Sequence, residues 1–205
     1  DENLKQKIAL FCNVKKQDVI QNKTVENLYE VPLMLEKEGL ASRICEKLKL
    51  RDIPNNLSWE ELINNIKNLK DENVNIAIVG KLEDSYLSIA ESIKHGGFAN
   101  GCKVHIDFID CEKVTKENAK EMLGKYNGVI VPGGFGNRGI EGKIATIQYV
   151  RENNIPFLGI CLGMQMAVVE FARDVLGYKD ANSEEFDEAS TCKVIHIMED
   201  QIHIA

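Results

Sequence analysis

From residue 74 onward, short apolar segments alternate with longer segments of helical periodicity. The strand-like segments span 74–80, 103–110, 128–132 and 156–160. The helical segments span 85–98, 115–126, 140–153 and 164–176. Short strands that alternate with helices of this length are typical of βαβ units, which build parallel sheets. The sequence therefore predicts the α/β class, with a mostly parallel sheet and helices on both faces.

Residues 1–73 do not share this alternation. The apolar run within 7–13 is interpreted as a strand. Helical periodicity recurs over 32–40, 41–48 and 58–69. The segment 67–73 is charged, lacks periodicity and precedes a clean strand, which is typical of a domain boundary. The sequence therefore predicts two domains, 1–73 and 74–205.

Bulk composition narrows the function classes. The 205 residues carry a formal net charge of −7, and no basic cluster offsets it, which argues against a nucleic-acid-binding surface. We also expect neither a membrane-spanning segment nor a signal peptide, because no apolar run has the required length and position. The six cysteines lie far apart without a CxxC pair, which favours a reduced, cytoplasmic protein over a disulfide framework or a metal site.

The segment GICLG, residues 159–163, places a cysteine at the corner between the last strand-like segment and the helical pattern that follows it. The flanking glycines permit a sharp strand-to-helix turn and leave the sulfur uncrowded. The positive end of a helix dipole also favours the thiolate, which is the nucleophilic form of cysteine. The pattern predicts a nucleophile elbow around Cys161.

A glycine-rich loop, VPGGFGNRG at 131–139, ends the strand-like segment that precedes the cysteine segment. Acyl transfer through a thiolate forms an oxyanion, which needs hydrogen-bond donors already in place. If the two strand ends lie side by side, the N–H groups of Gly134 and Leu162 can supply them. A plain tight turn is the alternative, and the spacing matches neither a phosphate-binding loop nor a dinucleotide fingerprint.

These motifs carry a resemblance that covers essentially the whole chain. The segments in the second half are VPGGFGNRG, PFLGICLGMQ at 156–165, DANSEEF at 180–186, KHGG at 94–97 and RGIEG at 138–142. The segments upstream are KIALFCN at 7–13 and TVENLYEVP at 24–32. Together they resemble the CTP synthase family. The resemblance implies a class I glutamine amidotransferase-like domain, preceded by the C-terminal piece of a Rossmann-like synthetase domain.

The resemblance implies roles for individual residues in glutamine hydrolysis. Cys161 would attack the side-chain amide of glutamine, release ammonia and carry a glutamyl thioester. Gly134 and Leu162 would supply oxyanion-hole amides, and Glu185 would hold the α-amino group of glutamine. The wall of the glutamine pocket would comprise Gly163, Met164 and Gln165. Without the resemblance, Glu185 would be interpreted as one more solvated acid.

The resemblance also implies nucleotide contacts. Lys7 matches a lysine that contacts the phosphates of UTP or CTP, and Val25 lies in the segment 23–25, which matches the surroundings of the ATP adenine. Without the resemblance, Lys7 would be an exposed lysine beside a strand. The residues that match contacts for allosteric activation by GTP are Phe135, Arg138 and Glu141.

The activity that the resemblance implies is the ATP-dependent amination of UTP to CTP, the last step of de novo CTP synthesis. Ammonia from glutamine would pass to a synthetase site that uses ATP with Mg²⁺, while GTP would activate the enzyme and the product CTP would inhibit it. The amidotransferase domain would need no cofactor. The family forms homotetramers, so the resemblance implies a homotetrameric, cytoplasmic ligase.

The chain departs from the family pattern in the partners of its nucleophile. The family's triad takes a histidine and a glutamate from a downstream His-Pro-Glu motif, and neither His196 nor His203 is followed by Pro-Glu. His196 lies in an alternating run, where a histidine is more often structural than catalytic. We therefore expect an amidotransferase domain truncated before that motif. We also expect the chain alone to be inactive, because loss of the base costs orders of magnitude in rate.

Three alternative functions stay open on the sequence. The chain could be the glutaminase part of another amidotransferase, a non-catalytic binding fragment of the same fold, or a thiol hydrolase of similar sheet topology. The upstream segments 7–13 and 24–32 argue against the first. Reaction of Cys161 with a glutamine analogue would separate the other two from a working glutaminase.

Overall fold

The computed structural model describes residues 2–51, 55–81 and 83–198. The chain divides into two compact units, Asp1–Leu69 and Lys70–Ala205, which we name the first and the second unit. None of the helices in the described residues combines the length and the apolar character needed to cross a membrane.

The regular elements in the described part of the first unit are all helices or helical turns. Its helices are α1 (Glu2–Cys12), α2 (Val31–Lys37), α3 (Leu40–Leu48) and α4 (Leu57–Lys67), with 3-10 turns η1 (Lys16–Asp18) and η2 (Leu28–Glu30). The helices predicted at 32–40, 41–48 and 58–69 are confirmed. Gly39, with φ of +85°, separates α2 from α3, because this left-handed conformation favours glycine.

The strand predicted within 7–13 is wrong, because residues 7–12 belong to helix α1. The apolar residues Leu4, Ile8 and Phe11 recur at helical spacing, and the described part of the first unit contains no strand with which 7–13 could pair. A continuous apolar run of this length fits either a strand or a helix. Because no strand in the described part of the first unit is present for pairing, the helix is favoured here.

Ion pairs link the elements of the first unit. Glu38, at the end of α2, accepts hydrogen bonds from Lys23 at 2.5 Å and from Lys5 at 2.9 Å. These two bonds lower the pKa of the Glu38 carboxyl to about 2.

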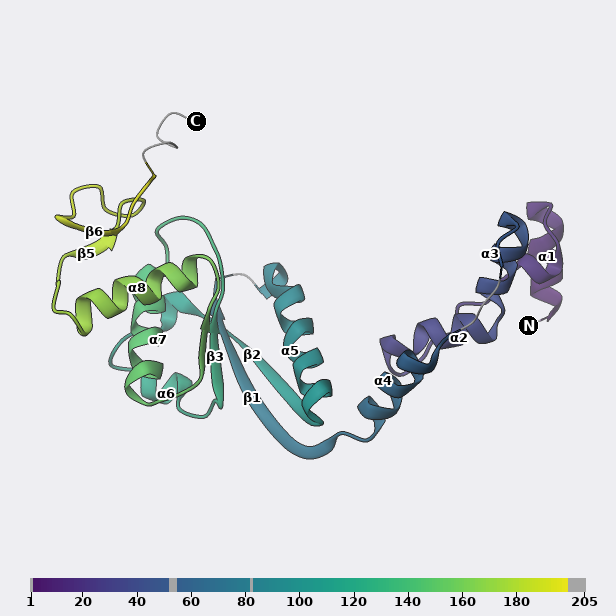
Figure 1. Ribbon diagram of the computed structural model, residues 1–205, viewed down its shortest axis with the longest axis horizontal. Coiled ribbons are helices and arrows are strands. Elements are labelled where there is room, and N and C mark those ends of the chain that lie inside the picture. Colours follow the sequence, from purple (N-terminus) through teal and green to yellow (C-terminus); the bar gives the residue numbers. More distant parts are fainter. Residues whose placement is uncertain (1, 52–54, 82, 199–205) are drawn as a thin grey trace. The chain divides into compact units, whose positions relative to one another are not determined.

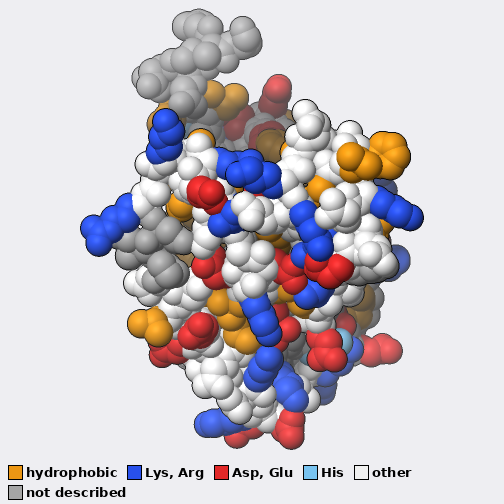
Figure 2. Space-filling view, turned by 90° about the vertical axis from the view of Figure 1, so that its right-hand side faces the viewer, with side chains coloured by type: hydrophobic (Ala, Val, Ile, Leu, Met, Phe, Trp, Pro, Cys, Tyr) orange, Lys and Arg blue, Asp and Glu red, His pale blue; other side chains and the backbone are white. Residues whose placement is uncertain are grey.

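Figure 2 shows basic and acidic side chains interspersed over the face that it presents.

The second unit is built on a four-stranded parallel sheet. Its strands are β1 (Lys70–Gly80), β2 (Cys102–Asp110), β3 (Gly128–Val131) and β4 (Phe157–Gly159), in the order β2-β1-β3-β4. The helices are α5 (Leu87–Asn100), α6 (Ala119–Leu123), α7 (Ile140–Glu152) and α8 (Leu162–Asp174), with 3-10 turns η3 (Glu83–Tyr86) and η4 (Cys111–Lys113). A separate parallel pair follows, β5 (Ala181–Ser183) with β6 (Cys192–Ile195). Figure 1 shows α5 on one side of the main sheet and α6, α7 and α8 on the other.

Alternate residues of β1 supply the cores on the two faces of the sheet. Ala77 and Val79 point into the cluster formed with α6, α7 and α8, whereas Ile78 packs with Tyr86 and Ala90 on the α5 side. All three β1 side chains are completely buried. Because successive side chains of a strand point to opposite faces, a strand buried on both faces must be apolar at every position. The predicted parallel sheet with helices on both faces is confirmed.

Two elements differ in length from the prediction. Strand β1 begins at Lys70 rather than at residue 74, because its polar first residues still pair with β2, starting at Cys102. The helix predicted at 115–126 is reduced to α6. The side chain of Asn118 accepts a hydrogen bond from the Thr115 N–H and donates one to the Lys113 carbonyl oxygen, each at 2.8 Å. These local bonds hold the preceding residues in turns and delay the start of the helix.

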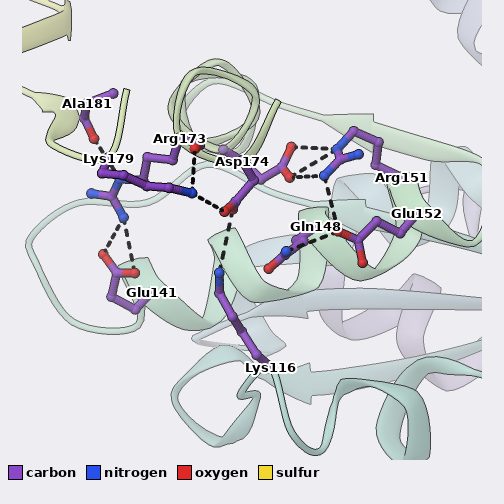
Figure 3. A network of polar contacts seen from close by, with 10 residues as sticks. Lys116, Glu141, Gln148, Arg151, Glu152, Arg173, Asp174, Lys179 and Ala181 are labelled. Carbon is purple, nitrogen blue, oxygen red and sulfur yellow. Dashed lines mark hydrogen bonds and ion pairs between the residues drawn. The ribbon is translucent and has the colours of Figure 1, made fainter. Parts of the chain in front are cut away.

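A polar network joins α7 to α8 on the outside of the sheet (Figure 3). Glu170 of α8 is 1% exposed, and Arg151 of α7 donates to both of its carboxylate oxygens at 2.7 to 3.1 Å. Arg173 of α8 binds the Glu141 carboxylate at 2.9 Å and the Ala181 carbonyl oxygen at 2.6 Å. The network therefore fixes α8 against α7 and against the start of β5.

Candidate active site

The candidate site lies at the carboxyl ends of β1, β3 and β4. The strand order β2-β1-β3-β4 changes direction between β1 and β3, because β2 is added on one side of β1 and the later strands on the other. In open α/β sheets the segments after two such strands diverge and leave a crevice, where ligands bind. The segments that follow β1, β3 and β4 all contribute to a cavity at this point.

The turn at Cys161 is a strained strand-to-helix corner. Cys161 has φ of 52° and ψ of −111°, a conformation that side chains with a Cβ atom rarely adopt. The corner is held from both sides, since the Ile160 N–H donates to the Val131 carbonyl oxygen at 3.0 Å and the Gln165 N–H donates to the Cys161 carbonyl oxygen at 3.1 Å. The predicted elbow geometry is therefore present, with the cysteine at the N-cap of α8.

Close backbone contact explains why residue 163 of the elbow is glycine. A Cβ atom on Gly163 would lie only 1.9 Å from the Val131 carbonyl oxygen, so only glycine lets α8 begin this close to β3. This close approach sets the start of α8 directly behind the end of β3. The cysteine is thereby carried to the edge of the sheet, where its side chain is exposed to the cavity.

The glycine loop lies directly against the elbow. Strands β3 and β4 are hydrogen-bonded neighbours, with Val131 opposite Gly159, so the predicted adjacency of the two turns is confirmed. The position of a Cβ atom on Gly133 lies 3.4 Å from the Cys161 Cβ and 3.9 Å from its Sγ. A larger side chain at residue 133 would therefore crowd the sulfur.

One backbone N–H group of the glycine loop and one of the elbow stay available to an incoming oxygen. Within the described residues, no acceptor takes the Gly134 N–H. Leu162 is the first residue of α8, and the N–H groups of a first helical turn have no partner within the helix. The pair can therefore act as the donors that an oxyanion requires, which supports the sequence-based assignment of these two residues.

The cavity beside the elbow has a volume of about 480 Å³. Its lining comes from the end of β1 with η3 and α5 (Lys81, Ser85, Tyr86, Ile89), from the glycine loop with α7 (Gly133, Gly134, Phe135, Arg138, Lys143) and from the elbow (Cys161). Three of these side chains are cationic and none is acidic. The cavity is therefore suited to ligands that carry or develop negative charge.

Lys143 is a lining residue that the sequence interpretation missed. It lies in the first turn of α7 and is only 3% exposed. Burial lowers the pKa of its ammonium group, while the nearby thiols of Cys111 and Cys161 act in the opposite direction. A signal was present in the sequence, because Lys143 takes a core position in the helical pattern of Ile140, Ile144 and Ile147.

The other residues assigned to glutamine binding lie around the elbow but outside the lining of this cavity. Gly163 is buried, Gln165 is half-buried and Met164 is exposed on α8. Glu185 lies exposed in the turn after β5. Its neighbour Glu184 is the acid that is held in place, by Lys193 at 2.7 Å and by the Ile197 N–H at 3.1 Å, and these bonds lower the pKa of its carboxyl. The role of Glu185 stays a prediction.

The residues assigned to GTP and to the other nucleotides are spread over the chain. Phe135 and Arg138 line the cavity, and Arg138 also binds Glu112 at 2.8 Å. Glu141 points elsewhere, toward Arg173 in the α7–α8 network. In the first unit, Lys7 is exposed on α1 and Val25 is half-buried in the loop before η2. These nucleotide roles stay predictions.

None of the described histidines lines the cavity, and His196 follows β6 with its Nδ1 3.1 Å from the Ile197 carbonyl oxygen. His203 lies outside the described residues. Within the described ranges, no group of three or more His, Cys, Asp or Glu side chains could hold a metal ion.

Comparison with protein families gives two matches. Residues 81–201 match the family described as glutamine amidotransferase class-I. Residues 1–50 match the family described as CTP synthase N-terminus. The two matches fall on either side of the division between the two units.

Individual relatives agree with the family matches. A CTP synthase of Clostridium beijerinckii is 54% identical over 98% of this chain, and one of Methanosarcina acetivorans is 48% identical over 100% of it. The chain spans only 38% and 39% of the length of these two relatives.

A solved structure is also similar, the Trypanosoma brucei CTPS glutaminase domain with bound acivicin. Its TM-score is 0.59 and its sequence identity 43%, over 62% of this chain and 51% of that one. The chain therefore belongs to the class I glutamine amidotransferase family, and it joins that domain to a segment that matches the CTP synthase N-terminus.

Proposed function

We propose that the second unit hydrolyses glutamine through Cys161. The observation that carries this proposal is the strained elbow that presents the Cys161 thiol to a cavity beside two unpaired backbone N–H groups. The similar Trypanosoma brucei glutaminase domain was solved with acivicin bound, and the relatives are CTP synthases. Glutamine is accordingly the substrate that we assign to the cavity.

In the proposed reaction, the Cys161 thiolate attacks the side-chain amide carbon of glutamine. The oxyanion of the tetrahedral intermediate accepts hydrogen bonds from the N–H groups of Gly134 and Leu162. The C–N bond then breaks, the nitrogen takes up a proton and leaves as ammonia, and a glutamyl thioester remains on the sulfur. Water hydrolyses the thioester to glutamate and restores the thiol.

We further propose that the ammonia serves a CTP synthase reaction, the ATP-dependent amination of UTP to CTP in pyrimidine biosynthesis. The support is the match of the first unit to the CTP synthase N-terminus and the identity to CTP synthases over nearly the whole chain. ATP with Mg²⁺, GTP as activator, CTP as inhibitor and a homotetramer belong to this proposal. No residue of the chain is proposed as a Mg²⁺ ligand, since the described residues form no such cluster. Six free cysteines are compatible with a cytoplasmic location.

Substitution of the nucleophile tests this function. In the complete protein, Cys161→Ala should abolish glutamine-dependent CTP formation and leave formation from free ammonia intact, because only the first route passes through the thioester. Cys192→Ala, at a half-buried cysteine on β6, serves as the matched control and should retain both activities. Equal loss of the two activities in Cys161→Ala would show that Cys161 does not belong to a separate glutaminase site.

A further inference from the structure

Lys143 is a buried cation in an environment that offers it little compensation. Its side chain enters the cavity from the first turn of α7, where the positive end of the helix dipole disfavours a second positive charge. Within the described parts of the chain, its Nζ makes no hydrogen bond and no ion pair. Partial removal of an unpaired ammonium group from water disfavours its charged form, and burial accordingly lowers the pKa of Lys143. An unpaired cation in this position needs an explanation other than fold stability.

The acids on either side of Cys111, the residue against which the start of α7 packs, are already engaged with other cations. On η4 and the end of β2, Glu112 pairs with Arg138 at 2.8 Å and Asp110 pairs with Lys113 at 3.6 Å. Cys111 on η4 is completely buried, and this burial raises the pKa of its thiol, which keeps it neutral. Lys81, directly after β1, has the same charge as Lys143 and disfavours the charged form of Lys143.

The elbow is the place where a negative charge can form beside Lys143. Its Nζ lies 3.3 Å from the position of a Cβ atom on Gly134, the residue next to Gly133 in the glycine loop that lies against Cys161. Its charge also interacts favourably with a Cys161 thiolate. Tyr86 is the remaining titratable group of the lining, and its hydroxyl is directed to the Gly133 carbonyl oxygen at 3.5 Å.

We propose that Lys143 supplies the countercharge for the anions that form at the elbow, first the Cys161 thiolate and then the oxyanion beside Gly134. Lys143 is thus a positioning residue that acts on the nucleophile through its charge. The second half of this inference rests on the proposed glutaminase function. The first half, the effect on the thiolate, requires only that Cys161 ionises.

The test is the pH dependence of the alkylation of Cys161 by iodoacetamide, followed at the Cys161 peptide by mass spectrometry. Loss of the charge in Lys143→Met should move the midpoint of the rate profile upward by about one pH unit, which is about a tenfold lower rate well below the midpoint. The charge-retaining variant Lys143→Arg should stay close to the wild-type midpoint. Lys113→Met removes an exposed cation outside this cavity and should leave the midpoint within about 0.2 unit, since exposed charges are screened.

Two internal readouts separate a charge effect from damage to the fold. The exposed Cys12 of the first unit should alkylate identically in all variants. The Lys143→Met protein should unfold at the same or a higher urea concentration, because an apolar side chain replaces an unpaired buried charge. A Lys143→Met profile that coincides with the wild-type profile, or an equal shift in Lys113→Met, would overturn the inference.

The outcome is distinguishable from that of the proposed function, because iodoacetamide does not need a glutamine pocket. A shifted midpoint in a protein whose Cys161 ignores glutamine analogues would support the Lys143 inference and contradict the glutaminase. An unchanged midpoint in a protein that hydrolyses glutamine would contradict the Lys143 inference and support the glutaminase.

Discussion

At the scale of single residues, backbone strain at Cys161 is the feature most directly tied to chemistry. A residue with a Cβ atom held at φ of 52° and ψ of −111° costs about 1–3 kcal/mol, which the surrounding contacts must offset. The contacts that do so are the hydrogen bond from Ile160 to β3 and the close fit of Gly163 against Val131. The elbow is therefore maintained by the sheet for a purpose other than stability.

This strain predicts that the usual order of stability of an alanine and a glycine variant is inverted at Cys161. Cys161→Gly should be more stable than Cys161→Ala by about 1–3 kcal/mol, because glycine relieves the strain and alanine keeps it. At Cys45, inside helix α3, the order should be the ordinary one, with alanine more stable than glycine by about 1 kcal/mol. Urea unfolding of the four variants gives the comparison. Equal stability of the two Cys161 variants would mean that the corner is not strained.

The sequence revealed the elbow but not its charged neighbour, for a physical reason. A glycine, cysteine and glycine at a strand-to-helix junction form a local pattern, so Cys161 could be found without any tertiary information. The proximity of Lys143 depends on how α7 packs on the sheet, which no local pattern specifies. Only its place among the buried residues of α7 marked it, and a lone lysine in an apolar stripe is a weak signal.

At the scale of elements, the sheet was predictable and the exceptions have local causes. Strand β3 and the second half of β1 are buried on both faces, so their apolar runs stand out in the sequence. The mistaken strand at 7–13 and the shortened helix α6 depended on information beyond periodicity. The first lacks a pairing partner among the described residues, and the second is delayed by the side chain of Asn118.

Arg151 offers a test of how α7 is fixed to α8, because it binds one buried and one exposed carboxylate. Glu170 is 1% exposed, whereas the side chain of Glu152 is 51% exposed. Glu170→Gln should lower the free energy of unfolding by about 3 kcal/mol, the lower end of the range for a broken buried pair, since Arg151 can still reach water. Glu152→Gln should change it by less than about 0.5 kcal/mol. Similar urea midpoints for the two variants would contradict the role assigned to the Arg151–Glu170 pair.

At the scale of the whole molecule, the chain combines a helical first unit with an α/β second unit that holds the candidate site. The sheet order places the ends of β1, β3 and β4 around one cavity, so the fold itself explains why the nucleophile and the glycine loop meet. The identity of the substrate does not follow from this geometry, because a thiol, two amides and a cationic cavity suit several acyl transfers. The assignment of glutamine as the substrate rests on the family match and on the relatives.

The measurement that tests the central claim most directly is the labelling of Cys161 by an electrophilic glutamine analogue such as acivicin. It requires a single acylation-like event and no turnover. We predict one label per chain at Cys161, formed much faster than at the exposed Cys12 of the same molecule and slowed by added glutamine. Labelling of Cys161 that is no faster than that of Cys12, and that glutamine does not slow, would contradict the glutaminase assignment.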